Sequence, residues 1–145
     1  MTDRETNIAT IKKAVEAVNQ RDFAVLRDLI RPEFQRHDLA GALPEVSGAE
    51  GAVDLIQLLL QAMPDLQIDL KQVIAAEDRV AAHITVSGTH KGELFGVPGT
   101  GKRVEINGIN LYRLVEGKIA ETWQLGDVWG LMRQVGAAPV PRQAG

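Results

Sequence analysis

The chain of 145 residues contains no cysteine. Disulfide bonds, thiolate nucleophiles and cysteine-ligated metals are therefore excluded, and the composition is typical of a protein that folds in a reducing cytoplasm. The three histidines do not have the HxH or HExxH spacing of a zinc site. We accordingly expect a cytoplasmic protein without a metal centre.

Long apolar runs and clustered basic charge are also missing. No apolar run approaches the 18 residues of a membrane-spanning helix, and the polar residues 1–5 do not fit a signal peptide. Sixteen basic residues are scattered among nineteen acidic ones, and the net charge is −3. This pattern favours neither a membrane nor a nucleic acid as partner. The length fits one domain spanning 1–145, in which we expect 137–145 to be a flexible tail.

Apolar spacing divides the chain into helices followed by strands. Steps of three and four residues predict an N-terminal helix from Thr2 or Asp3 to Val18, a second that ends at Arg31-Pro32, and a third from Ser47 or Gly48 to Pro64. Alternating residues then predict strands, and a short helix closes the pattern. The predicted strands are 66–73, 80–89, 104–114 and 118–125, with a short extended piece at 33–38 and the last helix at 130–136.

This order of elements predicts an α+β fold. We expect a curved antiparallel sheet packed against about three N-terminal helices. When such a sheet curls strongly, the helices and the sheet enclose a cone-shaped cavity.

Polar residues on the last two predicted strands point to the position of a site. Asn110, Thr122 and Gln124 share one face by strand parity and by the pairing of neighbouring strands. A buried amide or hydroxyl without a partner costs about 1–3 kcal/mol, so several on one face indicate a lined pocket. A solvated face or a subunit interface is the alternative. Trp123, on the opposite parity, could line a cavity wall or an interface.

Arg36, His37 and Asp38 form the one cluster in the chain that joins a guanidinium, an imidazole and a carboxylate. Histidine titrates near neutral pH, and an adjacent carboxylate can hold its tautomer, so His37 and Asp38 are candidate proton-transfer groups. On a regular strand only one of these two can enter the cavity, whereas Arg36 and Asp38 share a face. A salt bridge without chemistry at the start of a loop is the alternative.

Two further residues have open roles. His90 ends a strand on its apolar parity, where it could reach the mouth of a pocket or lie on the surface at a turn. Asp127 is a candidate general base three residues beyond Gln124, or the N-cap of the last helix.

Five short segments, in the same order along the chain, resemble the SnoaL-like polyketide cyclase family of the nuclear-transport-factor-two-like group. The resemblance covers about residues 5–136. The segments are 34–38 (FQRHD), 88–92 (GTHKG), 95–102 (FGVPGTGK), 117–123 (GKIAETW) and 127–136 (DVWGLMRQVG).

The resemblance implies a deep apolar cavity and an enzyme without a cofactor. In family cyclases an aspartate on the last strand acts as base and acid in an intramolecular aldol closure, assisted by a histidine on the neighbouring strand. Alignment through 117–119 puts Gln124 at the position of the aspartate and Asn110 at that of the histidine. Neither amide can titrate, which leaves Asp38, His37 or Asp127 to move the proton.

We therefore expect an enzyme that acts on a hydrophobic, polyketide-like carbonyl compound by aldol cyclisation or a related enolisation. Arg36, His90, Asn110, Thr122, Trp123 and Gln124 are the expected substrate-binding residues. The alternatives are a non-catalytic small-molecule-binding protein, or a hydroxylase, isomerase or hydrolase of the same fold. The resemblance also implies a homo-oligomer, a dimer or tetramer that covers the exposed face of the sheet.

Overall fold

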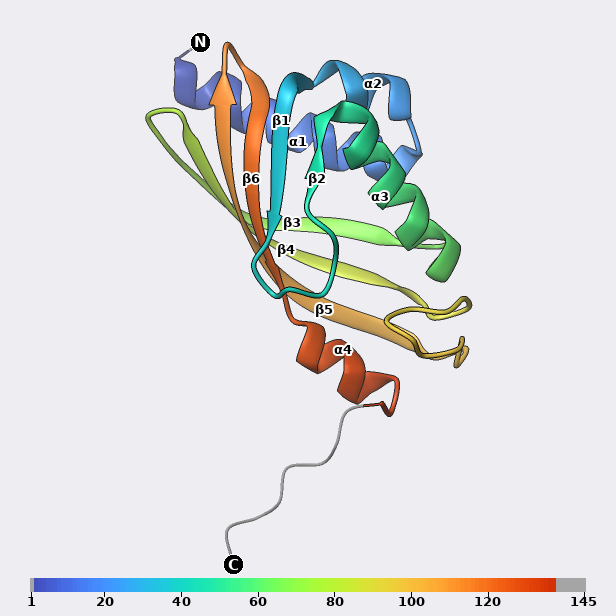
Figure 1. The fold of residues 1–145 in the computed structure, drawn as a ribbon. Coiled ribbons are helices and arrows are strands. Elements are labelled where there is room, and N and C mark those ends of the chain that lie inside the picture. Colours follow the sequence, from blue (N-terminus) through green and yellow to red (C-terminus); the bar gives the residue numbers. More distant parts are fainter. Residues whose placement is uncertain (1, 138–145) are drawn as a thin grey trace, which may run out of the picture.

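The computed structural model describes residues 2–137, which form a six-stranded sheet and four helices (Figure 1). Helices α1 to α3 lie on one side of the strongly curved sheet, and α4 extends beyond the end of β6. The helices are α1 (Asp3–Gln20), α2 (Phe23–Asp28), α3 (Gly48–Ala62) and α4 (Val128–Gln134). The strands are β1 (Ile30–Asp38), β2 (Val46–Ser47), β3 (Gln67–Ala76), β4 (Arg79–Thr89), β5 (Arg103–Val115) and β6 (Lys118–Gly126).

Local side-chain chemistry sets the boundaries of the N-terminal helices. The Thr2 hydroxyl accepts from the backbone N–H of Glu5, and the Glu5 carboxylate accepts from the N–H of Thr2. This capping box satisfies two of the N–H groups that have no partner inside a helix. Asp22 caps α2 with a single bond, in which its carboxylate accepts from the backbone N–H of Val25. The predicted helix starts at 2–3 and 47–48 are confirmed.

The α+β class is confirmed, but the sheet is mixed and open rather than wholly antiparallel or closed into a barrel. Its strand order is β2-β1-β6-β5-β4-β3, and β1 runs parallel to β6 whereas the other pairs are antiparallel. The parallel pairing is possible because the connection from β1 to β6 is long and contains α3 and the strands β3 to β5. A strand that joins a sheet through so long a crossover can run parallel to its neighbour.

The segment around Pro32 differs from the prediction. The second helix ends at Asp28 rather than at Arg31, because the Leu29 carbonyl accepts from the N–H of Ile119 and thereby starts the pairing of β1 with β6. Proline is tolerated in β1 because β2 pairs only with Gln35 and Arg36, which leaves the edge beside Pro32 open. The extended piece predicted at 33–38 is thus part of a nine-residue strand.

The core fills the space between the helices and the inner face of the sheet. Ile11 of α1, Val53 of α3 and Val80 of β4 are each at most 1% exposed. No helix among residues 2–137 is long and apolar enough to cross a membrane. The predicted tail, 137–145, lies outside the described residues except for Ala137.

Candidate functional site

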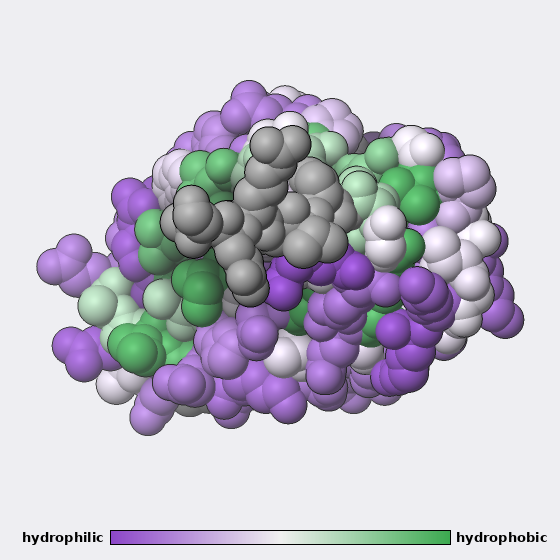
Figure 2. Space-filling view, turned by 90° about the horizontal axis from the view of Figure 1, so that it is seen from below, coloured by the Kyte–Doolittle hydropathy of each residue, from purple (hydrophilic) through white to green (hydrophobic). Residues whose placement is uncertain are grey.

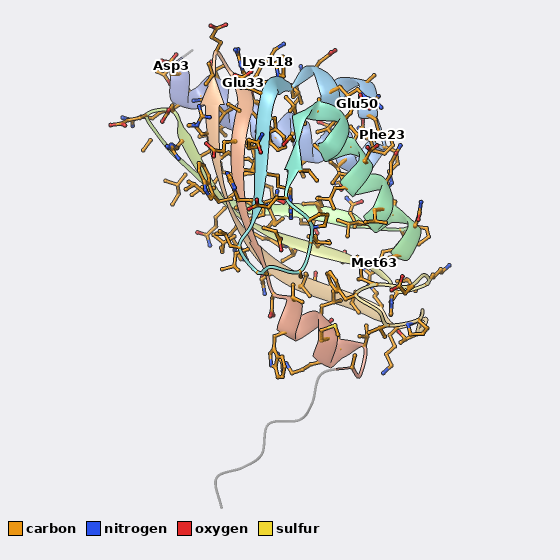
Figure 3. The ribbon with its side chains drawn as sticks, viewed as in Figure 1. Asp3, Phe23, Glu33, Glu50, Met63 and Lys118 are labelled. Atoms are coloured by element: carbon orange, nitrogen blue, oxygen red, sulfur yellow. The ribbon has the colours of Figure 1, made fainter. Side chains whose placement is uncertain are left out.

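A cavity of about 240 Å³ opens between the inner face of the sheet and helices α1 to α3. Its walls are mostly apolar and include Phe34, Leu55, Ile84 and Phe95. Met63, labelled in Figure 3 at the end of α3, lines the cavity beside the segment that joins β4 to β5. An apolar space of this kind suits a hydrophobic ligand.

Six of the polar residues that line the same cavity come from three adjacent strands and share one face. They form two rows across the sheet, because Thr122 lies opposite both Arg36 and Tyr112, and Gln124 lies opposite both Asp38 and Asn110. We call these residues the polar array: Arg36, Asp38, Asn110, Tyr112, Thr122 and Gln124. The structure thus brings together five of the nine residues that the sequence nominated, and it adds Tyr112.

The Arg36 guanidinium connects the array. It donates through Nε to the Gln124 amide oxygen, through Nη2 to Asp38 Oδ1 at 3.2 Å and through Nη1 to the Pro44 carbonyl at 3.4 Å. Arg36 is only 6% exposed. A buried guanidinium needs such partners, since an unpaired buried charge is strongly destabilising.

Asp38 is both a partner of Arg36 and the anchor of the following loop. Its Oδ2 accepts from the backbone N–H groups of Ala42 and Leu43, at 2.7 and 3.0 Å. With the Arg36 bond, three of the roughly four acceptor positions of the carboxylate are occupied. One position on Oδ1 therefore stays open for a proton from a ligand.

The contact with Arg36 also orients Gln124. A guanidinium can only donate hydrogen bonds, so the amide oxygen of Gln124 must face it. The Gln124 NH₂ group is left as a donor at the cavity wall. A site of this type can hold a carbonyl oxygen and stabilise negative charge on it.

Tyr112 is a member of the array that sequence reasoning missed. It lies two residues after Asn110 on the same strand face, so the alternation of side chains could have identified it. Asn110 Nδ2 donates to the Tyr112 hydroxyl oxygen at 3.1 Å, which leaves the phenol proton free to donate. Burial raises the pKa of Tyr112 above its ordinary value of 10.0, against smaller opposing effects of Asn110 and Arg36. The phenol is neutral at physiological pH.

The Thr122 hydroxyl has no hydrogen-bond partner within the described residues. Its Oγ1 is buried, the residue is 3% exposed, and it lies in the middle strand of the array. Most buried hydroxyls in proteins have a partner, so this one is an exception inside the cavity.

His37 and Trp123 lie on the opposite face of the sheet, which we call the outer face. Neither lines the cavity. Their rings stack with centroids 5.4 Å apart, His37 Nε2 lies 2.7 Å from a Glu121 carboxylate oxygen, and the Arg79 guanidinium lies over the Trp123 ring. As strand parity requires, the structure therefore separates His37 from Asp38.

The structure also places His90 and Asp127 outside the cavity lining. His90 is neither at a pocket mouth nor on the surface: it is 1% exposed, its Nδ1 is 3.0 Å from the Thr100 hydroxyl, and its Nε2 has no described partner. Asp127 caps α4 through a bond of 2.8 Å from the Gly130 N–H. Its second expected role, as the N-cap, is the one that the geometry supports.

Among residues 2–137 no group of three or more histidine, aspartate or glutamate side chains is arranged to hold a metal ion. The donors and acceptors of the cavity are thus amides, hydroxyls, one carboxylate and one guanidinium. This set can bind and polarise a carbonyl group.

Comparison with known proteins identifies the class. The model of the SnoaL-like polyketide cyclase family matches residues 9–135. The chain belongs to the SnoaL-like polyketide cyclase family, and the resemblance seen in its five segments is confirmed.

Individual relatives agree with this assignment. The chain is 30% identical over 133 residues to the aklanonic acid methyl ester cyclase DnrD of Streptomyces peucetius, which covers 90% of this chain and 91% of DnrD. Its fold matches AclR, a proposed hydroxylase from Streptomyces galilaeus, with a TM-score of 0.81, 34% identity and coverage of 94% and 99% of the two chains. It matches IdmH, a proposed polyketide cyclase from Streptomyces antibioticus, with a TM-score of 0.78, 31% identity and coverage of 90% and 98%.

The His37–Glu121 pair on the outer face predicts a pH dependence of stability. The Glu121 hydrogen bond raises the pKa of His37 above 6.5, with a smaller effect of Glu45, and His37 in turn lowers the pKa of Glu121 below 4.5. The contribution of His37 to the free energy of unfolding is complete below the pKa that His37 has in the unfolded chain. It is lost as the pH rises through the higher pKa of the folded protein. The contribution of Glu121 to the free energy of unfolding is present above pH 4.5. It is lost as the pH falls through the lower pKa that Glu121 has in the folded protein. The pair therefore stabilises the fold most between pH 4.5 and 6.5.

Urea unfolding of wild type and His37→Asn checks the direction of this pH dependence. The free energy of unfolding lost in the variant should be larger at about pH 5.5 than at about pH 8.5. An equal loss at both values would show that His37 stabilises the fold by packing on Trp123 alone.

Proposed function

We propose that the protein binds a hydrophobic, polyketide-like carbonyl compound in the cavity and catalyses its enolisation, leading to an intramolecular aldol cyclisation. The single observation that carries this proposal is the polar array on an otherwise apolar wall, in a chain of the SnoaL-like polyketide cyclase family. The name of its relative DnrD, an aklanonic acid methyl ester cyclase, supports a substrate of this class.

In the proposed reaction Gln124 holds the substrate carbonyl. Its free NH₂ group donates to the carbonyl oxygen and stabilises the negative charge that develops there as the enolate forms. The Arg36 guanidinium, bonded to the Gln124 oxygen, polarises the amide and increases its strength as a donor. Asn110, opposite Gln124 on β5, borders the same position.

Asp38 is the proposed general base because it is the one carboxylate among the described cavity-lining residues. The open position on Oδ1 takes a proton from the carbon next to the substrate carbonyl. The resulting enolate carbon attacks a second carbonyl of the same molecule, a carbon–carbon bond forms, and Asp38 returns the proton to the new alkoxide. Atoms and electrons balance without a cofactor.

Replacement of Asp38 should remove the proton acceptor. Exchange of the α-protons of 1-tetralone in D₂O, followed by NMR, measures enolisation without knowledge of the natural substrate. Asp38→Asn should slow the catalysed exchange by about 10²-fold or more, which is the usual contribution of a general base. Gln124→Leu should slow it by about 10²-fold through loss of the donor to the oxyanion.

Asp127→Ala is the matched control, because this carboxylate lies outside the cavity and caps α4. It should lose about 1 kcal/mol of stability, as expected for a lost N-cap, and keep the exchange rate of wild type. If Asp127→Ala lowers the exchange rate and Asp38→Asn does not, the assignment of Asp38 as the general base is wrong. The thermal unfolding midpoint of Asp38→Asn shows whether a lower exchange rate comes from the missing carboxylate or from destabilisation of the loop that Asp38 anchors.

Hydroxylation is a second candidate reaction, because AclR, a proposed hydroxylase, is 34% identical to this chain. The two reactions differ in product mass. An aldol addition within one molecule leaves the mass unchanged, whereas hydroxylation adds one oxygen atom and needs an external oxidant. A bound ligand with neither change would favour a binding protein without catalysis.

We also propose that the chain forms a homo-oligomer through the outer face. One apolar row crosses four strands there, formed by Ile74, Ala81, Leu111 and Trp123, which lie opposite one another in the sheet. Ile74 is 68% exposed and Leu111 is 38% exposed. A second copy of the chain that packs on this row would remove it from water. The expected cytoplasmic location stays a prediction.

Leu111→Lys tests this interface. A charge in the middle of the apolar row should disfavour association, because it would be buried without a partner. Light scattering should then show a smaller assembly than for wild type, with the α-proton exchange of 1-tetralone retained. A wild-type monomer at high concentration would rule out the proposed oligomer.

A further inference from the structure

The Thr122 hydroxyl is a polar group without a described partner inside the cavity. Its Oγ1 is fully buried, and an unpaired buried hydroxyl reduces stability, whereas a valine of the same shape would not. Thr122 lies on the inner face of β6 among residues that line the cavity. A hydroxyl in this position can be satisfied by an oxygen atom of a bound ligand.

Its neighbours in the same row strengthen this interpretation. Tyr112 lies directly opposite Thr122, and its phenol proton is free because Asn110 donates to the phenol oxygen. On the other side, the three nitrogens of Arg36 already donate to Gln124, Asp38 and Pro44. The row therefore presents two hydroxyl groups to the cavity and no acceptor within the described residues that satisfies them.

We propose that Thr122 and Tyr112 form a second oxygen-binding subsite, distinct from the carbonyl position at Gln124. It takes a carbonyl or hydroxyl oxygen of the same ligand, with Tyr112 as donor and Thr122 as donor or acceptor. This inference rests on the proposed function, since it assumes that the reacting carbonyl lies at Gln124. Thr122 and Tyr112 are then specificity-determining residues rather than catalytic ones.

The spacing of the two rows defines the class of ligand. Thr122 and Gln124 are two residues apart on one strand, which separates their positions by about 6.5–7 Å. The cavity walls around them are apolar. A ligand that uses both positions is therefore hydrophobic and carries two oxygen atoms several ångströms apart.

Anthraquinone and anthrone provide a matched pair of probes. Both are flat, three-ring ketones, and anthrone has a CH₂ group where anthraquinone has its second carbonyl. Isothermal titration calorimetry with wild type should give an affinity for anthraquinone about tenfold higher than for anthrone, as expected for one additional hydrogen bond in a buried site.

Thr122→Val should abolish most of this preference and leave the affinity for anthrone unchanged. Tyr112→Phe, which removes only the phenol hydroxyl, should act in the same direction. Thr122→Val should also raise the midpoint of thermal unfolding of the free protein, because a buried unpaired hydroxyl is removed. A lowered midpoint would mean that the hydroxyl has a structural partner, and would contradict the proposal.

Thr85→Val is the control variant. Thr85 also has a buried hydroxyl without a described partner, but it lies on β4 outside the cavity lining. This variant should keep the preference of wild type for anthraquinone. Loss of the preference in Thr85→Val as well would indicate a general effect on the sheet and would overturn the subsite.

The remaining outcomes separate the subsite from the proposed function. If wild type binds both compounds equally and Gln124→Leu weakens both, the carbonyl position is correct and the subsite is wrong. If wild type binds neither compound, both proposals are wrong.

Discussion

The buried Arg36 guanidinium is the interaction on which the rest of the site depends. Because its charge lies inside the protein, it must be paired, and it finds its partners on three segments: Asp38 on its own strand, Gln124 on β6 and the Pro44 carbonyl in the loop. These bonds hold Asp38 in the cavity and orient the Gln124 amide. The parallel pairing of β1 with β6 brings the groups together, since it places Asp38 opposite Gln124.

The two faces of the sheet have different roles. On the inner face the polar array interrupts an apolar cavity, and on the outer face an apolar row lies beside the charged residues His37, Glu121 and Arg79. Figure 2, viewed from the end of the molecule that carries α4, shows hydrophobic residues in several patches among hydrophilic ones. Exposed apolar side chains such as Leu39 and Trp129 show that apolar surface extends beyond the outer face.

Sequence reasoning identified the helices, the β3–β6 meander and the common face of Asn110, Thr122 and Gln124, because periodicity depends only on local spacing. It missed the parallel position of β1, since alternation does not reveal which strand lies beside which. The burial of His90 depends on the segment that folds back over it, through the bond from its N–H to the Lys102 carbonyl. Tyr112, by contrast, lies two residues after Asn110, so strand parity alone could have placed it on the same face.

The central claim is that the polar array holds a carbonyl oxygen at Gln124. A crystal structure of the protein with bound anthrone tests this claim most directly. The account predicts the ketone oxygen at about 3 Å from Gln124 Nε2, a normal hydrogen-bond distance, with the CH₂-bearing side of the ring toward Thr122. A ligand bound on the outer face, or with its oxygen away from Gln124, would contradict the account.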